Sequence, residues 1–385
     1  MRIAYLVRKT SGGMQAHIQG LLSGLDRLSF EPIVISPHSE KLFSSLENLG
    51  VDYFRVDMAD KISLKDDIIS ACLVASILRK IRPDILHVHG NKAALIGWLA
   101  SRFCPPRCMV ITIHNFLSGL DRNMGNLDQK PSALALVYKK ASKSVLNAAD
   151  LVIAVSTELG RYLKNEIGVR SNKVSIIPNG IDMKQWEAYR KSSFNARRIL
   201  GFADNVKLIG TMGRLVPFKG HQVLLKSISR LIKKHSDMHL LVIGDGPLRD
   251  ELIAQARALG ISQNVKFLGF VDEPGQYLAA LDVFVLASIA EPFGIAILEA
   301  MSLGLPVIST RSGGVVDIIE DRKTGLLVNP SDEASLADAI EELLNNKSLG
   351  KTLSQNGQKL VSEKFTIKAM VDKTCAIYNE LMYDA

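Results

Sequence analysis

Residues 283–301, VFVLASIAEPFGIAILEAM, carry the strongest signal in the chain. The four apolar residues Val283–Leu286 predict a strand that is buried on both faces. After a loop in which Pro292 suits the first turn of a helix, the segment continues as a helix that is apolar on every side. A buried strand that leads into a buried helix is typical of a parallel sheet covered by helices.

Strands and helices alternate in the same way along most of the chain. The apolar runs predict strands at Arg2–Val7, Pro32–Ser36, Asp52–Val56, Ile85–Val88, Val110–Ile113, Leu151–Val155 and Lys173–Ile177, and again at Lys207–Met212, His239–Ile243, Val265–Leu268, Val283–Leu286, Val307–Ser309 and Gly325–Val328. Helical patterns such as Leu64–Lys80 and Ser132–Ala148 lie between most of them. The pattern restarts near residue 206, and the tail from Ser335 onward is helical.

We therefore predict an α/β protein with two doubly wound, parallel-sheet (Rossmann-like) domains. Residues 1–185 would form the first domain, residues 200–365 the second, and residues 366–385 a C-terminal helix. Ligands of open parallel sheets bind beyond the carboxyl ends of the strands. Two such domains facing each other would enclose a cleft, lined by the residues that follow the strands.

The composition agrees with this organisation. A chain of 385 residues is long enough for two domains of roughly 150 residues each. Hydrophobic residues make up 47% and charged residues 22%, which excludes a disordered or fibrous protein. No window reaches the roughly 18 apolar residues of a membrane-spanning helix, and the run after Met1 is too short for a signal peptide. The four cysteines form no zinc pattern, so we expect a cytoplasmic protein with reduced thiols.

The net charge of +8 lies entirely in the first half of the chain. Residues 1–190 contain 25 Lys+Arg and 17 Asp+Glu, whereas residues 191–385 contain 22 of each. A basic half indicates an anionic partner, such as a phosphorylated substrate or an acidic membrane surface, or else a plain solvated surface. We expect no nucleic acid as a partner, because no nucleic-acid motif occurs and aromatic residues are only 6% of the chain.

Two glutamates flank or enter the helix of the opening segment. Glu291 precedes it, and backbone N–H groups near Gly294 and Ile295 would offer an anion site. Glu299 lies inside it and is the only charged residue between Glu291 and Arg311. A buried carboxylate needs hydrogen-bond donors, which either protein groups or a hydroxyl-rich ligand would supply.

Residues 213–220, GRLVPFKG, form the first strand-to-helix turn of the second domain. Arg214 and Lys219 would both lie at its ligand-binding edge. Arginine can bind two phosphate oxygens at once and lysine adds a compact charge, so the turn would neutralise a diphosphate. The alternative, a solvated basic turn, explains the flanking glycines less well.

The first domain carries weaker signals. Gly12 and Gly13 follow its first strand and would let the backbone approach a phosphate or a sugar closely. His114 follows another expected strand and would reach the same edge of the sheet. His87 and His89 lie on one face of a strand, but their spacing suggests no third metal ligand, so we interpret them as packing or cleft-lining residues.

Together these segments resemble the retaining glycosyltransferases of the GT-B fold, specifically family 4, over essentially the full length. The resemblance rests on the E-x7-E segment Glu291–Glu299, the G-R-x-x-x-x-K-G turn Gly213–Gly220, Gly12 and Gly13, His114, the turn Pro178–Asp182 and the segment Thr324–Val328. It implies that the first domain binds the acceptor and the second the donor, and that the C-terminal helix crosses back to the first domain. Asp317 is a departure, because the family often has Glu there in a loop that shapes the donor pocket.

The resemblance also implies a role for each matched residue. The catalytic groups would be His114 on the sugar, Arg214 and Lys219 on the donor diphosphate, and Glu291 on the transferred sugar and its phosphate. The substrate-binding positions would be Gly12, Gly13, Gly213, Phe270, Phe293, Gly294, Ile295 and Glu299, with Glu299 on the ribose hydroxyls and Phe270 near the nucleobase.

The implied reaction moves a hexosyl group from a nucleotide-diphosphate sugar to an acceptor hydroxyl with retention, in glycan, glycolipid or polysaccharide biosynthesis. A UDP-sugar is the expected donor, ahead of guanosine diphosphate mannose. The acceptor would be a glycan, a lipid-linked molecule or a small molecule. Because no Asp-x-Asp occurs in the chain, we expect neither a metal ion nor another cofactor. The alternatives are an epimerase or hydrolase of the same fold and a non-catalytic sugar-nucleotide-binding partner.

One expected helix suggests a use for the basic half. Lys130, Lys139, Lys140 and Lys143 flank the apolar run Leu134–Val137. Such a helix could lie peripherally on the inner face of an anionic membrane. The alternative is an ordinary surface helix without a membrane contact. Membrane contact would favour a lipid-linked acceptor.

Overall fold

The computed structural model describes residues 1–8, 12–59, 63–117, 133–191, 193–203 and 205–383, and only the backbone of residues 64, 133–136, 191 and 193–195. The chain divides into two compact units. Unit 1 contains Met1–Gly180 and Ile367–Ala385, and unit 2 contains Ile181–Thr366. The chain thus passes from unit 1 to unit 2 inside the turn Pro178–Asp182, slightly before residue 185.

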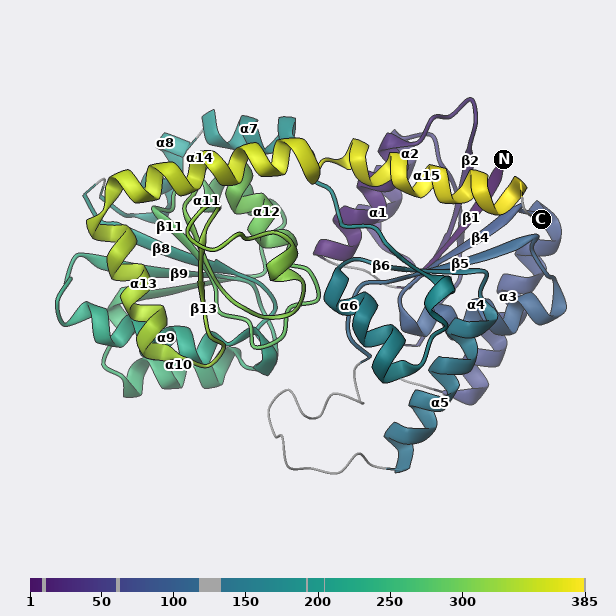
Figure 1. Ribbon diagram of the computed structural model, residues 1–385, viewed down its shortest axis with the longest axis horizontal. Coiled ribbons are helices and arrows are strands. Elements are labelled where there is room, and N and C mark those ends of the chain that lie inside the picture. Colours follow the sequence, from purple (N-terminus) through teal and green to yellow (C-terminus); the bar gives the residue numbers. More distant parts are fainter. Residues whose placement is uncertain (9–11, 60–62, 118–132, 192, 204, 384–385) are drawn as a thin grey trace. The chain divides into compact units, whose positions relative to one another are not determined.

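Unit 1 is a parallel sheet between two layers of helices (Figure 1). The order β3-β2-β1-β4-β5-β6-β7 is formed by β1 (Arg2–Val7), β2 (Glu31–Ser36), β3 (Asp52–Arg55), β4 (Ile85–His89), β5 (Cys108–Ile113), β6 (Leu151–Ala154) and β7 (Val174–Ile176). Among the described helices, α1 (Gly13–Gly24), α2 (Glu40–Asn48) and α15 (Ile367–Tyr383) cover one face, and α3 (Leu64–Ile81), α4 (Asn91–Phe103) and α5 (Ala133–Ala148) cover the other. The short helix α6 (Thr157–Tyr162) follows β6.

Unit 2 repeats this design with a second sheet (Figure 1). The order β10-β9-β8-β11-β12-β13 is formed by β8 (Lys207–Met212), β9 (Met238–Ile243), β10 (Val265–Gly269), β11 (Val283–Leu286), β12 (Val307–Thr310) and β13 (Leu326–Val328). The helices α9 (His221–Ile232), α10 (Arg249–Ala258) and α13 (Glu333–Asn345) lie on one face. The helices α7 (Met183–Lys191), α8 (Ser193–Leu200), α11 (Gly275–Leu278), α12 (Ile295–Ser302) and α14 (Lys347–Lys364) lie on the other.

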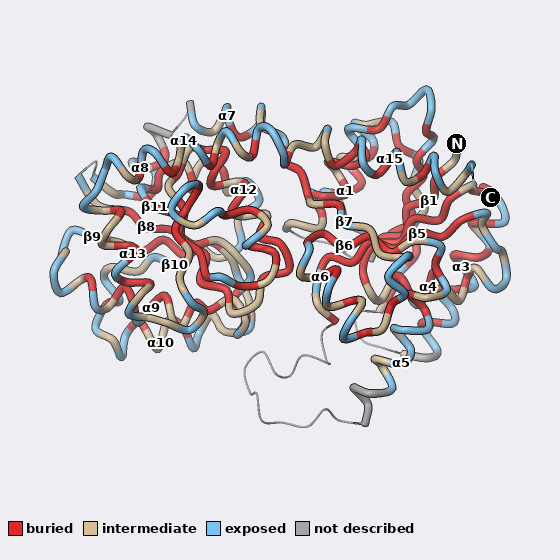
Figure 2. Tube along the Cα trace, in the orientation of Figure 1, coloured by how far each residue is buried: buried red, intermediate tan, exposed pale blue. Residues whose placement is uncertain are grey.

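Each sheet has its own buried core, and Figure 2 shows the central strands as buried along their length. The core of unit 1 includes Met370, Val371 and Tyr378 from α15, so the last helix of the chain completes the first unit. In both sheets the strand order reverses once, between β1 and β4 and between β8 and β11. At such a reversal the connecting loops diverge and leave a crevice beyond the carboxyl ends of the strands.

The prediction of two parallel α/β sheets is confirmed, since every expected strand overlaps an observed one. Two predictions for the segment 283–301 were wrong. Helix α12 begins at Ile295 with Gly294 as its N-cap at a φ of 101°, so Pro292 lies before the helix and not in its first turn. The helix is also not buried on every side, because Ala296 and Glu299 are half-buried. None of the described helices is long and apolar enough to cross a membrane, and the four cysteines are free thiols.

Candidate active site

Two loops of unit 2 meet beside the reversal between β8 and β11. One is 213–220, between β8 and α9, and the other is 287–294, between β11 and α12. The backbone N–H of Ile289 donates to the carbonyl of Phe218 at 2.7 Å, which fixes one loop against the other. Gly220 makes this approach possible, because it has a φ of 68° and a Cβ there would lie 1.9 Å from the carbonyl oxygen of Ala287.

The two loops bring Lys219 and Glu291 together. Lys219 Nζ lies 2.6 Å from Glu291 Oε2, and the two side chains are 18% and 6% exposed. The hydroxyl of Ser288 donates to the same carboxylate oxygen at 2.8 Å. The carbonyl of Ser288 in turn accepts from the hydroxyls of Thr310 and Ser312. Lys219, the residue predicted to bind the diphosphate, and Glu291, the residue predicted to bind the sugar, thus form one largely buried ion pair that Ser288 holds in place.

Arg214 completes the positive side of this edge. Its guanidinium is exposed, and within the described part of the chain it has no ion-pair partner. Its carbonyl accepts a hydrogen bond from His221 Nε2 at 3.3 Å, and burial lowers the pKa of His221 to about 4. His221 is therefore neutral and supports the turn, a role that the sequence did not suggest.

The N-terminus of α12 supplies backbone donors next to Glu291. Gly294 caps the helix and Ile295 is its first residue, so N–H groups at this end have no partner within the helix. The side chain of Phe293 is only 2% exposed and its ring lies 6.0 Å from that of Phe365. Only the backbone of Phe293 would therefore be available to a ligand.

Glu299, one turn further along α12, lacks the protein donors that its environment requires. Its side chain is half-buried, and no hydrogen bond or ion pair reaches its carboxylate from the residues that the structure describes. Burial raises the pKa of Glu299 to about 7. Of the two explanations that the sequence left open, a hydroxyl-rich ligand now fits better than protein donors.

The remaining predicted positions also lie at carboxyl ends of strands. Gly213 follows β8 directly, and its N–H donates to the carbonyl of Ile243 at 3.0 Å. Phe270 follows β10 and is 62% exposed. In unit 1, Gly12 precedes α1 and is exposed, and Gly13 is the first residue of that helix.

His114 belongs to a cluster of buried histidines in unit 1 that the sequence did not reveal. Its Nε2 lies 3.2 Å from His89 Nδ1, and its ring centroid lies 4.6 Å from that of His17 in an edge-to-face arrangement. His17 Nδ1 lies 2.8 Å from the side-chain oxygen of Asn179. Burial lowers the pKa of His17, His89 and His114, so all three are neutral at physiological pH.

The cluster is the one group of described residues with metal-ligand geometry. One ligating atom from each of His17, His89 and His114 lies within 4.8 Å of the others. The spacing of His87 and His89 in the sequence suggested no third ligand, because the neighbours of His89 come from α1 and from the loop after β5. However, the group contains no carboxylate, and Arg8 is close enough to help lower the pKa of His114. Positive charge nearby disfavours a dication.

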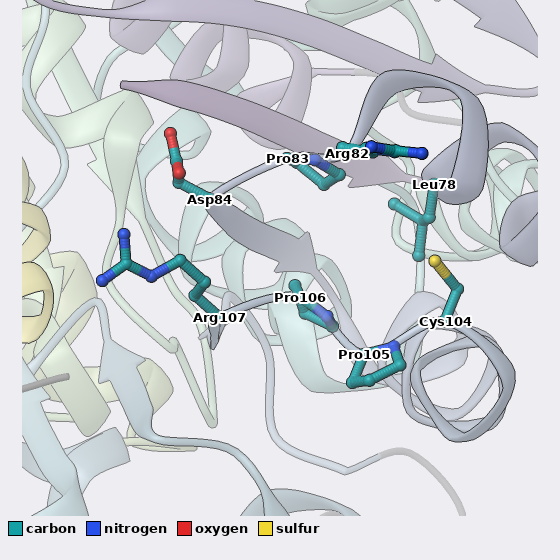
Figure 3. Close-up of a pocket in the computed structure, with 8 residues that line it drawn as sticks. All are labelled: Leu78, Arg82, Pro83, Asp84, Cys104, Pro105, Pro106 and Arg107. Atoms are coloured by element: carbon teal, nitrogen blue, oxygen red, sulfur yellow. The ribbon is translucent and has the colours of Figure 1, made fainter.

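Two pockets lie away from this edge of the sheets. One of 240 Å³ is formed where β4 and β5 begin, between Arg82–Asp84 and Cys104–Arg107 (Figure 3). The other, of 530 Å³, lies between α7, the end of α12 and α14. The first lies where strands begin, and the second is lined only by residues of helices. Ligands of open parallel sheets bind beyond the carboxyl ends of the strands, so we assign the site to the loops described above.

Comparisons with known proteins identify the family of the chain. The family described as glycosyl transferases group 1 matches residues 192–360, and glycosyltransferase family 4 matches residues 11–185. A UDP-Gal:α-D-GlcNAc-diphosphoundecaprenol α-1,3-galactosyltransferase of Escherichia coli is 27% identical over 383 residues, 95% of this chain and 97% of the relative. An N-acetyl-α-D-glucosaminyl L-malate synthase of Bacillus anthracis is 27% identical over 83% of this chain and 80% of the relative.

The fold is shared with solved structures. Anabaena HepE, crystallised in complex with UDP-glucose, has a TM-score of 0.84 at 22% identity, covering 99% of this chain and 100% of that one. The two family matches together span nearly the whole chain, one over each sheet. With its two parallel sheets and its site loops at their strand-order reversals, the chain belongs to the group 1 glycosyltransferases of the GT-B fold.

Proposed function

We propose that the protein transfers a hexosyl group from a UDP-sugar to a hydroxyl group of a lipid-linked or polysaccharide acceptor, with retention of configuration. The observation that carries the proposal is the arrangement around the N-terminus of α12. There a Lys219–Glu291 pair, with 2.6 Å between Nζ and Oε2, precedes the helix, and the carboxylate of Glu299 follows inside it without a partner among the described residues. This arrangement suits a nucleoside diphosphate that carries a sugar.

Each part of such a donor has a matching group. The diphosphate would bind Arg214, Lys219 and the backbone N–H groups at the start of α12. The two ribose hydroxyls would donate to Glu299. As the glycosidic bond breaks, negative charge grows on the leaving phosphate, and donors already aimed at that position stabilise it without reorganising. Glu291 would hold the sugar while Ser288 keeps its carboxylate in place.

In the first unit, His114 would contact the sugar, and this unit would also bind the acceptor. In the sequence of this unit no carboxylate stands out as a nucleophile, so we propose same-face substitution without a covalent intermediate. We also propose that the reaction needs no metal ion, because the charge on the leaving group is met by arginine, lysine and backbone donors. Activity should therefore persist after extensive treatment with EDTA, with the metal content of the treated protein measured in parallel.

The choice of UDP follows from relatives. The Escherichia coli relative is named for UDP-Gal, and Anabaena HepE was crystallised with UDP-glucose. The acceptor class follows from the same relative, whose name specifies a diphosphoundecaprenol. These names support a UDP-sugar donor and a lipid-linked acceptor for this chain.

A lipid-linked acceptor would agree with peripheral membrane contact through α5. On this helix Lys140 and Lys143 are exposed, and the side chain of Val137 is 65% exposed. Lys130 and the side chains of residues 134–136 lie outside the described part of the chain. Co-sedimentation with vesicles containing phosphatidylglycerol should exceed that with neutral vesicles, and the double variant Lys140→Ala/Lys143→Ala should lose the difference. Equal sedimentation with both vesicle types would reject the membrane contact.

Thermal-shift measurements with a panel of nucleotide sugars test the donor assignment first. A ligand that binds only the folded protein raises its melting temperature. One nucleotide sugar should stabilise the protein, and Lys219→Ala and Glu299→Ala should both lose the shift. The control variants Lys359→Ala and Glu363→Ala carry the same changes on the exposed surface of α14 and should keep it.

The stabilising donor is then incubated with and without candidate acceptors. Product formation that depends on the acceptor supports a transferase. Donor consumption without any acceptor would favour a hydrolase or epimerase of the same fold instead. If no nucleotide sugar stabilised the protein at millimolar concentration, the donor site would be wrongly assigned.

A further inference from the structure

The buried contact between His89 and His114 is a hydrogen bond between two ring nitrogens, and two neutral rings share one proton in such a bond. His89 Nδ1 and His114 Nε2 are 3.2 Å apart, and both side chains are buried, with exposures of 0% and 9%. A neutral imidazole has one N–H and one bare nitrogen. One of the two rings therefore donates and the other accepts, and the direction decides which atom of His114 remains for a ligand.

The second nitrogen of His89 settles that direction. His89 Nε2 is fully buried and has no hydrogen-bond partner among the described residues. A buried N–H without an acceptor is rarer and costlier than a buried lone pair without a donor. The proton of His89 thus lies on Nδ1, where an acceptor is available, and not on Nε2.

We propose that His89 is a positioning residue that donates its Nδ1–H to His114 Nε2 and thereby holds His114 as the Nδ1–H tautomer. In this form His114 offers a hydrogen-bond donor to its ligand and no free basic nitrogen. That His114 meets the substrate rests on the function proposed above, whereas its tautomer does not. Its partner on the substrate is then a lone pair, such as that of a hydroxyl oxygen, and His114 takes no part in proton abstraction.

The neighbouring side chains hold His89 in place. His87 packs against it with 4.2 Å between ring centroids. Both nitrogens of His87 are engaged, Nδ1 with the hydroxyl of Tyr378 and Nε2 with that of Thr112 at 2.7 Å. Because His87 is hydrogen-bonded to side chains of α15 and of β5, it gives the ring of His89 a fixed packing partner.

His17 follows the same rule on the other side of His114. Its Nδ1 contacts the side-chain oxygen of Asn179 and must donate, which leaves a bare Nε2, and this buried atom also has no partner among the described residues. The ring of His17 stands at 74° to that of His114. His114 is thus enclosed by two neutral rings of defined tautomer, and burial keeps the pKa of each below its ordinary value.

Nuclear magnetic resonance of the full chain labelled with ¹⁵N-histidine tests the tautomer directly. Long-range ¹H–¹⁵N correlations distinguish protonated from bare ring nitrogens, and the signals of His114 are assigned as those missing from the His114→Gln variant. We expect a protonated Nδ1 and a bare Nε2 that do not change between pH 6 and pH 8. A protonated Nε2, or a ring that titrates in this range, would overturn the proposal.

Two variants of His89 test its effect on His114. The amide nitrogen of an asparagine lies near the position of Nδ1, and that of a glutamine lies near Nε2. His89→Asn should therefore keep His114 as the Nδ1–H tautomer. His89→Gln should no longer hold this tautomer and should lower kcat by about fivefold to tenfold, as expected for one lost hydrogen bond. KM for the donor should change less than kcat.

A merely structural role for His89 would make the two variants equal in kcat and in the His114 signals, which is the outcome that rejects the proposal. Melting temperatures report whether either variant is misfolded. If the wild-type protein showed no transfer at all, the proposed function would fail, and the spectra of the wild-type protein and His89→Gln would still decide the tautomer.

Discussion

Glu299 is an acid whose pKa of about 7 leaves it about half protonated at neutral pH. Two hydroxyl donors of a bound ribose favour the ionised form and would lower this pKa. Binding of UDP at pH 7 should therefore release about half a proton per site. Titration calorimetry in two buffers of different ionisation enthalpy measures that release, and Glu299→Gln should abolish it. Binding of UDP without proton release would show that Glu299 does not bind the ribose hydroxyls.

The same carboxylate should make the stability of unit 2 depend on pH. Its pKa is raised from an ordinary value of 4.5 to about 7, so the folded state keeps the proton to a higher pH than the unfolded state. Glu299 then costs no stability below pH 4.5 and destabilises the fold increasingly as the pH rises through 7. In denaturant titrations from pH 5 to pH 8, Glu299→Gln should lose less stability than the wild-type protein. A parallel pH profile for both proteins would contradict this.

Single residues of the donor site were partly visible in the sequence. Glu299 stood out as a lone charge in an apolar helix, and Lys219 stood out through its flanking glycines. Ser288, which supports Glu291, gave no signal because one serine in a loop has no pattern. His17 was missed for a different reason. It lies on the buried face of α1, and only the tertiary fold brings it within reach of His114.

At the scale of elements, the junction of the two site loops depends on one residue without a side chain. A Cβ at Gly220 would meet the carbonyl oxygen of Ala287 at 1.9 Å and would occupy a backbone region with a φ of 68°. Gly260 has a similar φ of 72° and nothing within 4 Å. Gly260→Ala should cost about 1–2 kcal/mol for the left-handed backbone alone, and Gly220→Ala should cost more. Denaturant unfolding of both variants measures the difference, and equal losses would show that the loops can separate freely.

The strands were predictable because several of them are continuously apolar, as helices on both faces of the sheet require, and the others, such as β3 and β10, continue the alternation of strands and helices. The start of α12 was not predictable, because proline is frequent at the first position of helices and Pro292 therefore suggested an earlier start. In the structure Gly294 adopts the capping conformation instead, and this delays the helix to Ile295. Sequence patterns locate elements well, but their exact ends depend on which residue takes the cap.

For the whole molecule, the two cores predict two separate unfolding transitions. Met370, Val371 and Tyr378 bury α15 in the core of unit 1, whereas no residue of α15 belongs to the described core of unit 2. Deleting residues 367–385 should lower the melting temperature of unit 1 by at least about 10 °C and leave that of unit 2 nearly unchanged. Scanning calorimetry resolves the two, with Lys368→Ala on the exposed face of α15 as the control. An equal shift of both transitions would mean that α15 supports the molecule as a whole.

The presence of two sheets was predictable from the restart of the strand pattern near residue 206. The partners of the last helix were not predictable from the pattern alone, because the hydroxyl of Tyr378 meets His87 across 291 residues of chain. Only the resemblance to a known family pointed to that return. Contacts between such distant segments leave no periodic trace in a sequence.

The return of α15 also sets the order in which the protein can mature on the ribosome. Unit 1 begins the chain, yet its core stays incomplete until residues 367–383 have been made. At typical rates of synthesis, the intervening segment takes roughly ten to forty seconds to translate. During that time the face of the first sheet that awaits α15 is open to solvent and to chaperones. Unit 2 has its whole sequence as soon as residue 366 has been added, before α15 has been made. The nascent chain should therefore complete its second half before its first.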